Sequence, residues 1–185
     1  MRKADLTRDK LLDAASVAFC TLGYSNASLR AIAKAADVDV ALISRYFGGK
    51  LGLFRAALES AFEWDEILDA ARDPIEVAIA KYADAGTEAH QVSAIRMIVM
   101  NASDPEVGDL LRGVLREKLI DPLQERMGGR QAASQLAMFA AVVLGASIVR
   151  QTLKLPGMAG VPDAEYADQL RYLINAAISF DGPDA

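Results

Sequence analysis

The sequence predicts an all-α protein with a three-helix head at its N-terminus and a helical body behind the head. Apolar residues recur every three or four positions along most of the 185-residue chain, as they do on one face of a helix. No stretch alternates apolar and polar residues between turn signals, as a half-buried strand would. Breaks at Asp73-Pro74, Gly128-Gly129 and Pro156–Gly160 divide the periodic stretches.

The head is predicted to contain three short helices. The first follows Thr7 as its N-cap and ends at Gly23, which supplies a left-handed stop. The second starts near Ser28, and the third runs from about Val40 to Phe47 after a tight turn at Asp37-Val38-Asp39. Two short helices joined by a three- or four-residue turn are typical of a helix-turn-helix motif.

Two stretches carry a specific resemblance to a known family: Gly23 to Ala33 and Val38 to Phe54. The second contains the aromatic pair Tyr46-Phe47 and, three residues later, Lys50. In order and spacing the two stretches resemble the DNA-binding head of TetR-type transcriptional repressors. The remainder of the chain is similar to that family only in length and helical character.

Three residues depart from the family pattern: Asp37 replaces the usual Gly, Asp39 the preferred Ser, and Ser44 a frequent Tyr. Aspartate tolerates the left-handed conformation better than most residues, so we expect the turn to persist. Asp39 can still cap the third helix. Because a carboxylate beside DNA phosphates is unfavourable, Asp39 is predicted either to face a base edge or to weaken affinity.

The chain is expected to divide into a head, residues 1–50, and an effector-binding and dimerisation body, residues 51–185. Body helices are predicted over six ranges: Leu51 to about Asp69, Pro74 to about Gly86, Glu88 to Asn101, Asp104-Pro105 to Arg116 or on to Asp121-Pro122, Arg130 to Leu153, and Pro162-Asp163 to Phe180.

The net charge of −5 is unevenly distributed. Residues 1–50 carry eight Lys or Arg against five Asp, a balance of +3, whereas the rest carries twelve against twenty, a balance of −8. This asymmetry favours a head that meets a polyanion, with a modest electrostatic share of the binding.

The catalytic inventory is small. His90 is the single histidine and Cys20 the single cysteine, which nearly excludes Cys/His metal sites and histidine-based triads. Asp65, Asp69 and Asp73 share one helical face, but no second acidic face opposes them, so a solvated stripe is favoured over a magnesium site. We therefore expect no metal, no cofactor and no enzymatic activity.

The longest apolar stretch, Leu136 to Val149, is interrupted by Gly145 and Ser147. It falls short of the ~20 residues of a membrane span, so a core or interface helix is predicted. With one cysteine and no apolar signal segment, cytoplasmic residence is expected.

The third helix is predicted to face the DNA. Its outward positions, counted from the inward Ile43, carry small residues that permit close approach to base edges, and Arg45 is the candidate for a guanine or a phosphate. Tyr46, Lys50, and Ser28 with the second-helix N–H groups are assigned to phosphates, while Arg30 could pair with phosphate or with Asp37. The predicted DNA-binding residues are Ser28, Arg30, Asp39, Val40, Ala41, Ser44, Arg45, Tyr46 and Lys50.

The family resemblance implies a pocket in the body for a small-molecule effector. Large aromatic side chains and adaptable methionines suit a pocket for varied apolar ligands, although each of them alone fits plain core equally well. The candidates are Phe62, Trp64, Tyr82, Arg96, Met97, Met100, Asn101, Met138 and Phe139.

Two apolar stripes, on Leu136–Gln151 and on Tyr166–Phe180, predict a homodimer through the last two helices. The expected function is a repressor that leaves a near-palindromic, double-stranded operator when a small apolar ligand binds. Two alternatives stay open: an activator or nucleoid-type binder without a ligand switch, and an all-α enzyme or carrier whose helix-turn-helix is merely structural.

Overall fold

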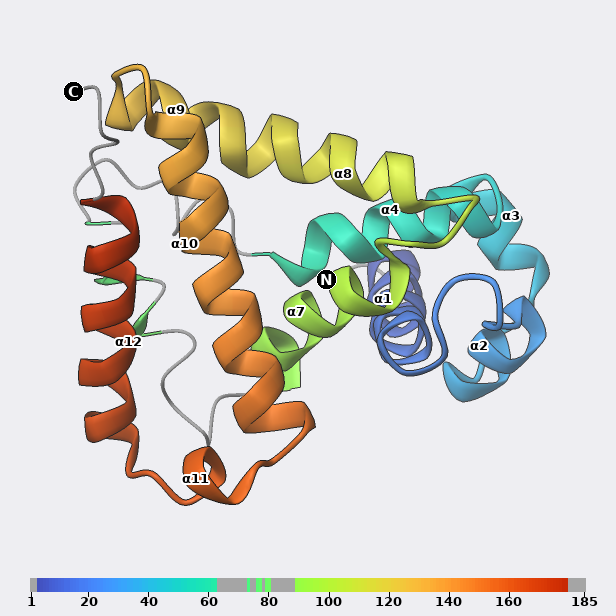
Figure 1. Ribbon diagram of the computed structural model, residues 1–185. Helices are drawn as coiled ribbons and strands as arrows, with labels where there is room; N and C mark the ends of the chain where they lie inside the picture. The colour runs from blue at the N-terminus through green and yellow to red at the C-terminus, as the bar shows by residue number, and fades with distance from the viewer. Residues whose placement is uncertain (1–2, 63–72, 74–75, 78, 81–88, 180–185) are drawn as a thin grey trace. The chain divides into compact units, whose positions relative to one another are not determined.

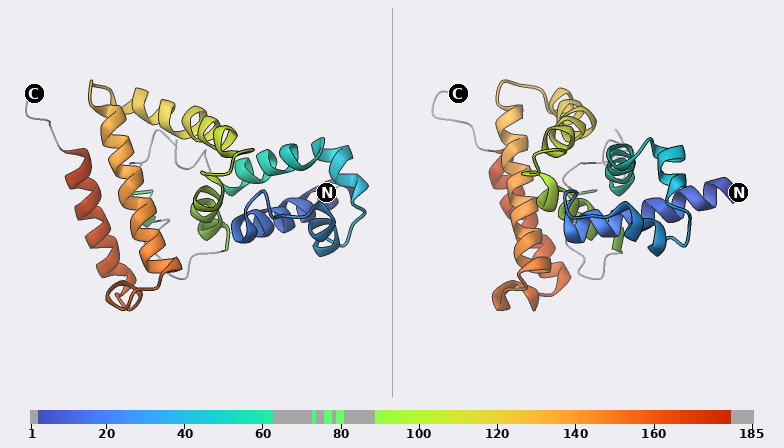
Figure 2. Two further views of the ribbon diagram at one scale, coloured as in Figure 1. Left: turned by 45° about the vertical axis from the view of Figure 1, so that its right-hand side comes forward. Right: turned by 90° about the vertical axis from the view of Figure 1, so that its right-hand side faces the viewer.

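The computed structural model describes residues 3–62, 73, 76–77, 79–80 and 89–179, and in these residues every regular element is helical (Figures 1 and 2). The predicted all-α class is therefore confirmed. The elements are α1 Lys3–Leu22, α2 Leu29–Ala35, α3 Ala41–Phe47, α4 Lys50–Ala61, α7 Ala89–Asn101, α8 Gly108–Leu115, the π-helical turn η1 Arg116–Ile120, α9 Asp121–Met127, α10 Ala132–Ser147, the π-helical turn η2 Ile148–Thr152, α11 Pro156–Ala159 and α12 Asp163–Ile178.

The chain forms two compact units. Unit 1 consists of Met1–Phe62 and Val92–Val114, and unit 2 of Glu63–Gln91 and Leu115–Ala185. A segment remote in sequence, covering most of α7 and α8, thus belongs with the three N-terminal helices and α4.

An aromatic cluster forms the centre of unit 1. The Phe19 ring lies 5.9 Å from the Tyr24 ring and 5.1 Å from the Phe54 ring, and all three residues are buried. Phe47 and Leu22 are not fully buried. Phe47 is half-buried beside Tyr46, and Leu22 is 51% exposed because the helical period turns it away from the core.

Asn101 joins α7 to the N-terminal helices. It is fully buried, and its Oδ1 accepts a hydrogen bond from the Tyr24 N–H at 2.6 Å. Its Nδ2 donates to the carbonyl oxygens of Phe19 and Met97, at 3.1 and 2.8 Å. Both amide N–H groups and the carbonyl oxygen of Asn101, a predicted ligand contact, are thereby engaged within unit 1, and Asn101 does not line the cavity described below.

A second tie lies next to it. The Asp104 carboxylate accepts hydrogen bonds from the Ser25 hydroxyl at 2.6 Å and the Ser25 N–H at 3.2 Å. The same carboxylate accepts from the Glu106 N–H at 2.9 Å and so shapes the turn that precedes α8. These bonds explain why α8 begins at Gly108, later than the predicted start at Pro105.

Several predicted boundaries shift. Helix α1 starts at Lys3, so Thr7 lies inside it, and Asp5 in the first turn suits the positive end of the helix dipole. Helix α4 ends at Ala61, eight residues before the predicted Asp69, because Phe62 adopts an extended conformation. Helix α7 begins at Ala89 and ends at Asn101, as predicted to within one residue, and Val99 and Met100 on it are 47% and 43% exposed.

In unit 2, α10 and α12 run side by side in opposite directions, joined through η2 and α11 (Figures 1 and 2). Their facing sides bury Leu136 and Val143 on α10 and Leu170 and Ile174 on α12.

The π-helical turn η1 precedes Pro122, where the sequence predicted a kink or a restart. Proline lacks an N–H and its ring clashes with the carbonyl four residues earlier, so a locally wider turn accommodates it without ending the helix.

By length and composition alone, α10 with η2 (Ala132–Thr152, 21 residues) would suffice to cross a membrane. It exceeds the predicted apolar length because the helix continues through Gly145 and Ser147. Only 22% of its most apolar window is buried, so much of an apolar helix surface faces outward.

Candidate DNA-binding surface and ligand cavity

A Schellman motif ends α2. The Asp37 N–H donates to the Lys34 carbonyl at 3.2 Å and the Val38 N–H to the Ala33 carbonyl at 3.0 Å, the pair of bonds that defines this motif. Asp37 occupies its left-handed position with φ of 56°. The turn therefore retains its geometry with aspartate in place of glycine.

Asp39 caps α3. Its Oδ1 accepts a hydrogen bond from the Ala41 N–H at 2.7 Å, and its carbonyl accepts from the Leu42 N–H at 3.1 Å. One carboxylate oxygen is thus engaged at the helix start, while the side chain remains exposed on the same surface as α3.

One side of α3 is anchored and the other is open. Ile43 is fully buried, whereas the outward positions are exposed: Val40, Ala41, Ser44 and Arg45. The exposed strip combines three small or short side chains with one guanidinium. The strip lies on a single helix, and the major groove of B-DNA is wide enough to admit one helix.

Glycines fix α3 against the start of α4. Gly48 ends α3 in the left-handed conformation with φ of 73°. A Cβ at Gly52 would lie 1.8 Å from the Phe47 carbonyl oxygen, so no larger residue fits where these two helices meet. The direction of the exposed strip is therefore set by backbone contact.

Two cations lie over aromatic rings at this surface. The Lys50 Nζ lies 4.5 Å from the centre of the Tyr24 ring, and the Arg8 guanidinium lies 5.3 Å from the centre of the Phe47 ring. Such contacts limit the freedom of long basic side chains. Arg8 was not among the residues predicted from the sequence, because it precedes the helix-turn-helix motif. In the structure it is an exposed cation on the N-terminal part of α1.

The remaining predicted contacts lie at accessible positions. Ser28 is exposed at the N-cap of α2, and its side chain makes no capping hydrogen bond. Arg30 is exposed and Tyr46 half-buried. Within the described ranges, neither Arg30 nor Arg45 enters an ion pair, so the predicted alternative of Arg30 pairing with Asp37 is not observed.

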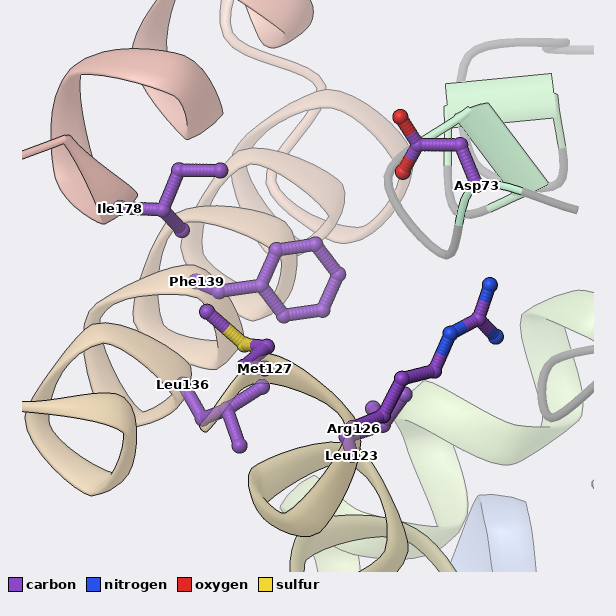
Figure 3. A pocket seen from close by; sticks show the side chains of 7 residues that line it. All are labelled: Asp73, Leu123, Arg126, Met127, Leu136, Phe139 and Ile178. Atoms are coloured by element: carbon purple, nitrogen blue, oxygen red, sulfur yellow. The ribbon is translucent and has the colours of Figure 1, made fainter. Parts of the chain in front are cut away.

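Unit 2 contains a cavity of about 250 Å³. Its lining residues are Asp73, Leu123, Arg126, Met127, Leu136, Phe139 and Ile178. Figure 3 shows Ile178 on one side, the Asp73 and Arg126 side chains on the other, and the Phe139 ring between them. An apolar interior with few charged groups at one side is typical of a small-molecule site.

Of the nine predicted ligand residues, Phe139 lines this cavity. Met138 lies on α10 with 54% of its surface exposed, and Phe62 and Met97 are buried in unit 1. Arg96 and Met100 are exposed on α7, while Trp64 and Tyr82 lie outside the described residues. The lining comes from separate segments that only the fold brings together, so no sequence pattern marked Leu123, Met127 or Ile178.

Residues 73–178 match the tetracyclin repressor-like C-terminal domain, and residues 11–57 match the tetR family of bacterial regulatory proteins. A probable HTH-type transcriptional regulator of Bacillus subtilis strain 168, YttP, is 46% identical over 57 residues. That match spans 31% of this chain and 28% of the relative.

Solved structures resemble the whole chain. A TetR-family regulator from Streptomyces coelicolor A3 is 25% identical, with 97% of this chain and 98% of that one covered and a TM-score of 0.58. NalD, the secondary repressor of the MexAB-OprM multidrug efflux pump in Pseudomonas aeruginosa, is 17% identical, with 95% and 97% covered and a TM-score of 0.71. The latter likeness concerns the fold alone.

Proposed function

Since this chain belongs to the TetR family of DNA-binding transcriptional regulators, we propose that it is a homodimeric repressor that a small apolar ligand releases from a near-palindromic operator. The observation that carries the proposal is the exposed strip of α3, held in place by Ile43 on one side and by Gly48 and Gly52 at its end. Such a strip is suited to reading bases and has no catalytic chemistry of its own.

In the proposed complex, Val40, Ala41 and Ser44 approach base edges, and Arg45 contacts a guanine or a nearby phosphate. Lys50 and Tyr46 bind the backbone. Ser28, Arg30 and the first N–H groups of α2 bind a further phosphate. Arg8, held over Phe47, adds one more backbone contact.

The proposed dimer forms through the last two helices, Leu136–Gln151 and Tyr166–Phe180. The outward side of α10 supports it, because this side presents Ala137, Met138, Ala141 and Gly145 to solvent. Small residues permit close helix approach, and an apolar surface of this length is unfavourable in water. A two-fold dimer carries two heads and so fits an operator with two related halves.

The proposed effector site is the cavity of unit 2, whose size suits a small apolar compound. A ligand shifts the protein between two states only by as much as it binds one better than the other, so release requires that the cavity differ between the DNA-bound and released states. We place the protein in the cytoplasm, as is general for regulators of this family.

The test has two stages. In the first stage, genomic fragments retained by the purified protein are sequenced to define the operator. The expected result is one near-palindromic site, and equal retention of all fragments would contradict the proposal.

In the second stage, apolar compounds are titrated against the operator complex, with Ile178→Phe as the variant that fills part of the cavity. A compound that releases wild type but not this variant supports the switch, whereas release by no compound favours a regulator without a ligand switch.

A further inference from the structure

A cluster of buried polar side chains lies where α10 ends and α12 begins. Arg150, on η2, is 4% exposed, and Ser147 and Tyr166 are each 1% exposed. The nearest cavity-lining residue on the same helical stretch, Phe139, is eleven positions away, about 16 Å along a helix. The cluster is therefore separate from the cavity described above.

The Arg150 guanidinium is only partly satisfied. Its Nη2 donates to the Val161 carbonyl at 3.1 Å and to Asp163 Oδ1 at 2.5 Å. The guanidinium carbon lies 4.0 Å from the centre of the Tyr166 ring. In the part of the chain that the structure describes, Arg150 Nε and Nη1, the Tyr166 hydroxyl and Ser147 Oγ have no hydrogen-bond partner.

This cluster has an excess of donors. A guanidinium has five N–H groups, no acceptor, and a charge that it does not lose in proteins. Burial raises the pKa of Tyr166 more than the Arg150 charge lowers it, so the phenol keeps its proton at neutral pH. Buried donors without acceptors are costly, and each one in a native structure needs a physical account. An acceptor with more than one oxygen would satisfy several of these donors at once.

We propose that this cluster is a binding site for a carboxylate, which accepts hydrogen bonds from Arg150 Nε and Nη1, the Tyr166 hydroxyl and Ser147. The guanidinium fork matches the two oxygens of a carboxylate. Asp163 already balances the single positive charge of Arg150, so any bound anion adds net negative charge, and a carboxylate adds less of it than a phosphate dianion.

The cluster is buried, and the connection Leu153–Pro162 is tied to it at one end. Arg150 holds the end of this connection through Val161 and Asp163, and the Asp163 side chain is half exposed. Much of the connection is exposed, including Leu153 and Leu155 at 58% and 48%. A carboxylate enters when this connection moves aside, and it then takes the donors that have no acceptor in the closed form.

The probes are sodium acetate, sodium hexanoate, the neutral isostere hexanamide, and inorganic phosphate, all at constant ionic strength set with sodium chloride. Thermal unfolding and calorimetric titration of the full chain give Tm and Kd. The two carboxylates are expected to raise Tm by about 5 °C or more at about a hundred times Kd, whereas hexanamide and phosphate leave it unchanged.

Two variants and one control locate the effect. Arg150→Gln is expected to abolish carboxylate binding, and Tyr166→Phe, which keeps the ring, to weaken it about tenfold. Arg130→Gln removes an equal charge from an exposed position of unit 2 and should bind carboxylates like wild type. If Arg150→Gln does not fold, Tyr166→Phe and a third variant, Ser147→Ala, which removes one donor and should also weaken binding, still decide.

Equal responses to hexanoate and hexanamide would overturn the proposal, as would carboxylate binding that Tyr166→Phe and Ser147→Ala leave intact. A crystal structure with an ordered water or an acidic side chain of a second copy in the cluster, in the presence of acetate, would also overturn it. None of these measurements involves DNA, so a failure here leaves the proposed regulatory function untouched, and the reverse also holds.

Discussion

At the scale of single residues, Arg45 and Lys50 carry the same charge but are proposed to do different work. Lys50→Ala should weaken binding to operator and to random DNA alike, and should reduce the slope of log affinity against log salt by about one unit per subunit. Arg45→Ala, if Arg45 reads guanine, should cost roughly 1–3 kcal/mol per half-site on operator and relax preference at one base. Fluorescence anisotropy at several salt concentrations measures both effects.

Asp13→Ala, at an exposed position on α1, is the control and should bind like wild type. If Arg45→Ala shifts operator and random DNA equally, Arg45 is a backbone contact like Lys50. If both variants bind operator like wild type, α3 does not lie in the groove and the proposed function is wrong.

Asp39 presents the opposite charge on the same surface. Serine also caps helices, so Asp39→Ser keeps the acceptor for the Ala41 N–H while it removes a carboxylate. We expect tighter binding to all sequences and an unchanged Tm. Tighter binding to random DNA together with weaker binding to operator would instead mean that the carboxylate reads a base.

At the scale of elements, unit 1 depends on hydrogen bonds that join segments far apart in sequence. Replacing Asn101 by Leu leaves the Tyr24 N–H and the Phe19 carbonyl without their buried partner. The expected loss is about 2–4 kcal/mol of unfolding free energy, measured by urea denaturation. Asn175→Leu, at an exposed position of α12, should cost little. Equal effects of both changes would contradict the role of Asn101.

Asp104 makes a pH-dependent contribution to the same junction. The hydrogen bond from Ser25 is the main cause that lowers the pKa of Asp104 below its ordinary value. A carboxylate with a lowered folded-state pKa adds stability above its unfolded pKa of about 3.9 and loses it as pH falls through the folded-state pKa.

Asp104→Asn should therefore lower the free energy of unfolding at about pH 6, and Tm with it, by less than about 1 kcal/mol because the group is accessible to solvent. In strong acid it should have no effect. Thermal unfolding of wild type and variant across this range measures the gap, with Asp13→Asn as the control. A gap that is constant with pH would show that the contribution does not depend on the Asp104 charge.

The sequence predicted the helix-turn-helix because its determinants are local. Gly23, the Asp37 turn and the Asp39 cap each act within five residues, so their spacing alone indicates the structure. The return of α7 to unit 1 was not predictable in this way. It rests on bonds such as that between Tyr24 and Asn101, which are 77 positions apart, and no periodic pattern marks such a pair.

At the scale of the whole molecule, the proposed dimer rests on the outward side of α10. Ala141 is exposed in the single chain, so Ala141→Arg should not disturb its core but should place two charges in the interface. Analytical ultracentrifugation at micromolar concentration is expected to give a dimer for wild type and a monomer for the variant, with operator affinity lower for the variant.

Gln124→Arg adds the same charge at an exposed position of α9 and should remain dimeric. A monomeric wild type under these conditions would sink the dimer. A dimeric Ala141→Arg would place the interface on another surface.

If the cavity is the effector site, as proposed, its size limits which concentrations of ligand the protein can respond to. A volume of about 250 Å³ equals the share of about eight waters in the liquid, so a ligand that fills it would have roughly as many non-hydrogen atoms. Ligands gain from about 0.3 to about 1.5 kcal/mol of binding free energy per non-hydrogen atom. At about 0.7 kcal/mol per atom, the binding free energy is about 6 kcal/mol, which corresponds to a Kd of tens of micromolar. The proposed switch would then respond to a compound only at micromolar or higher concentration, and not to traces of it.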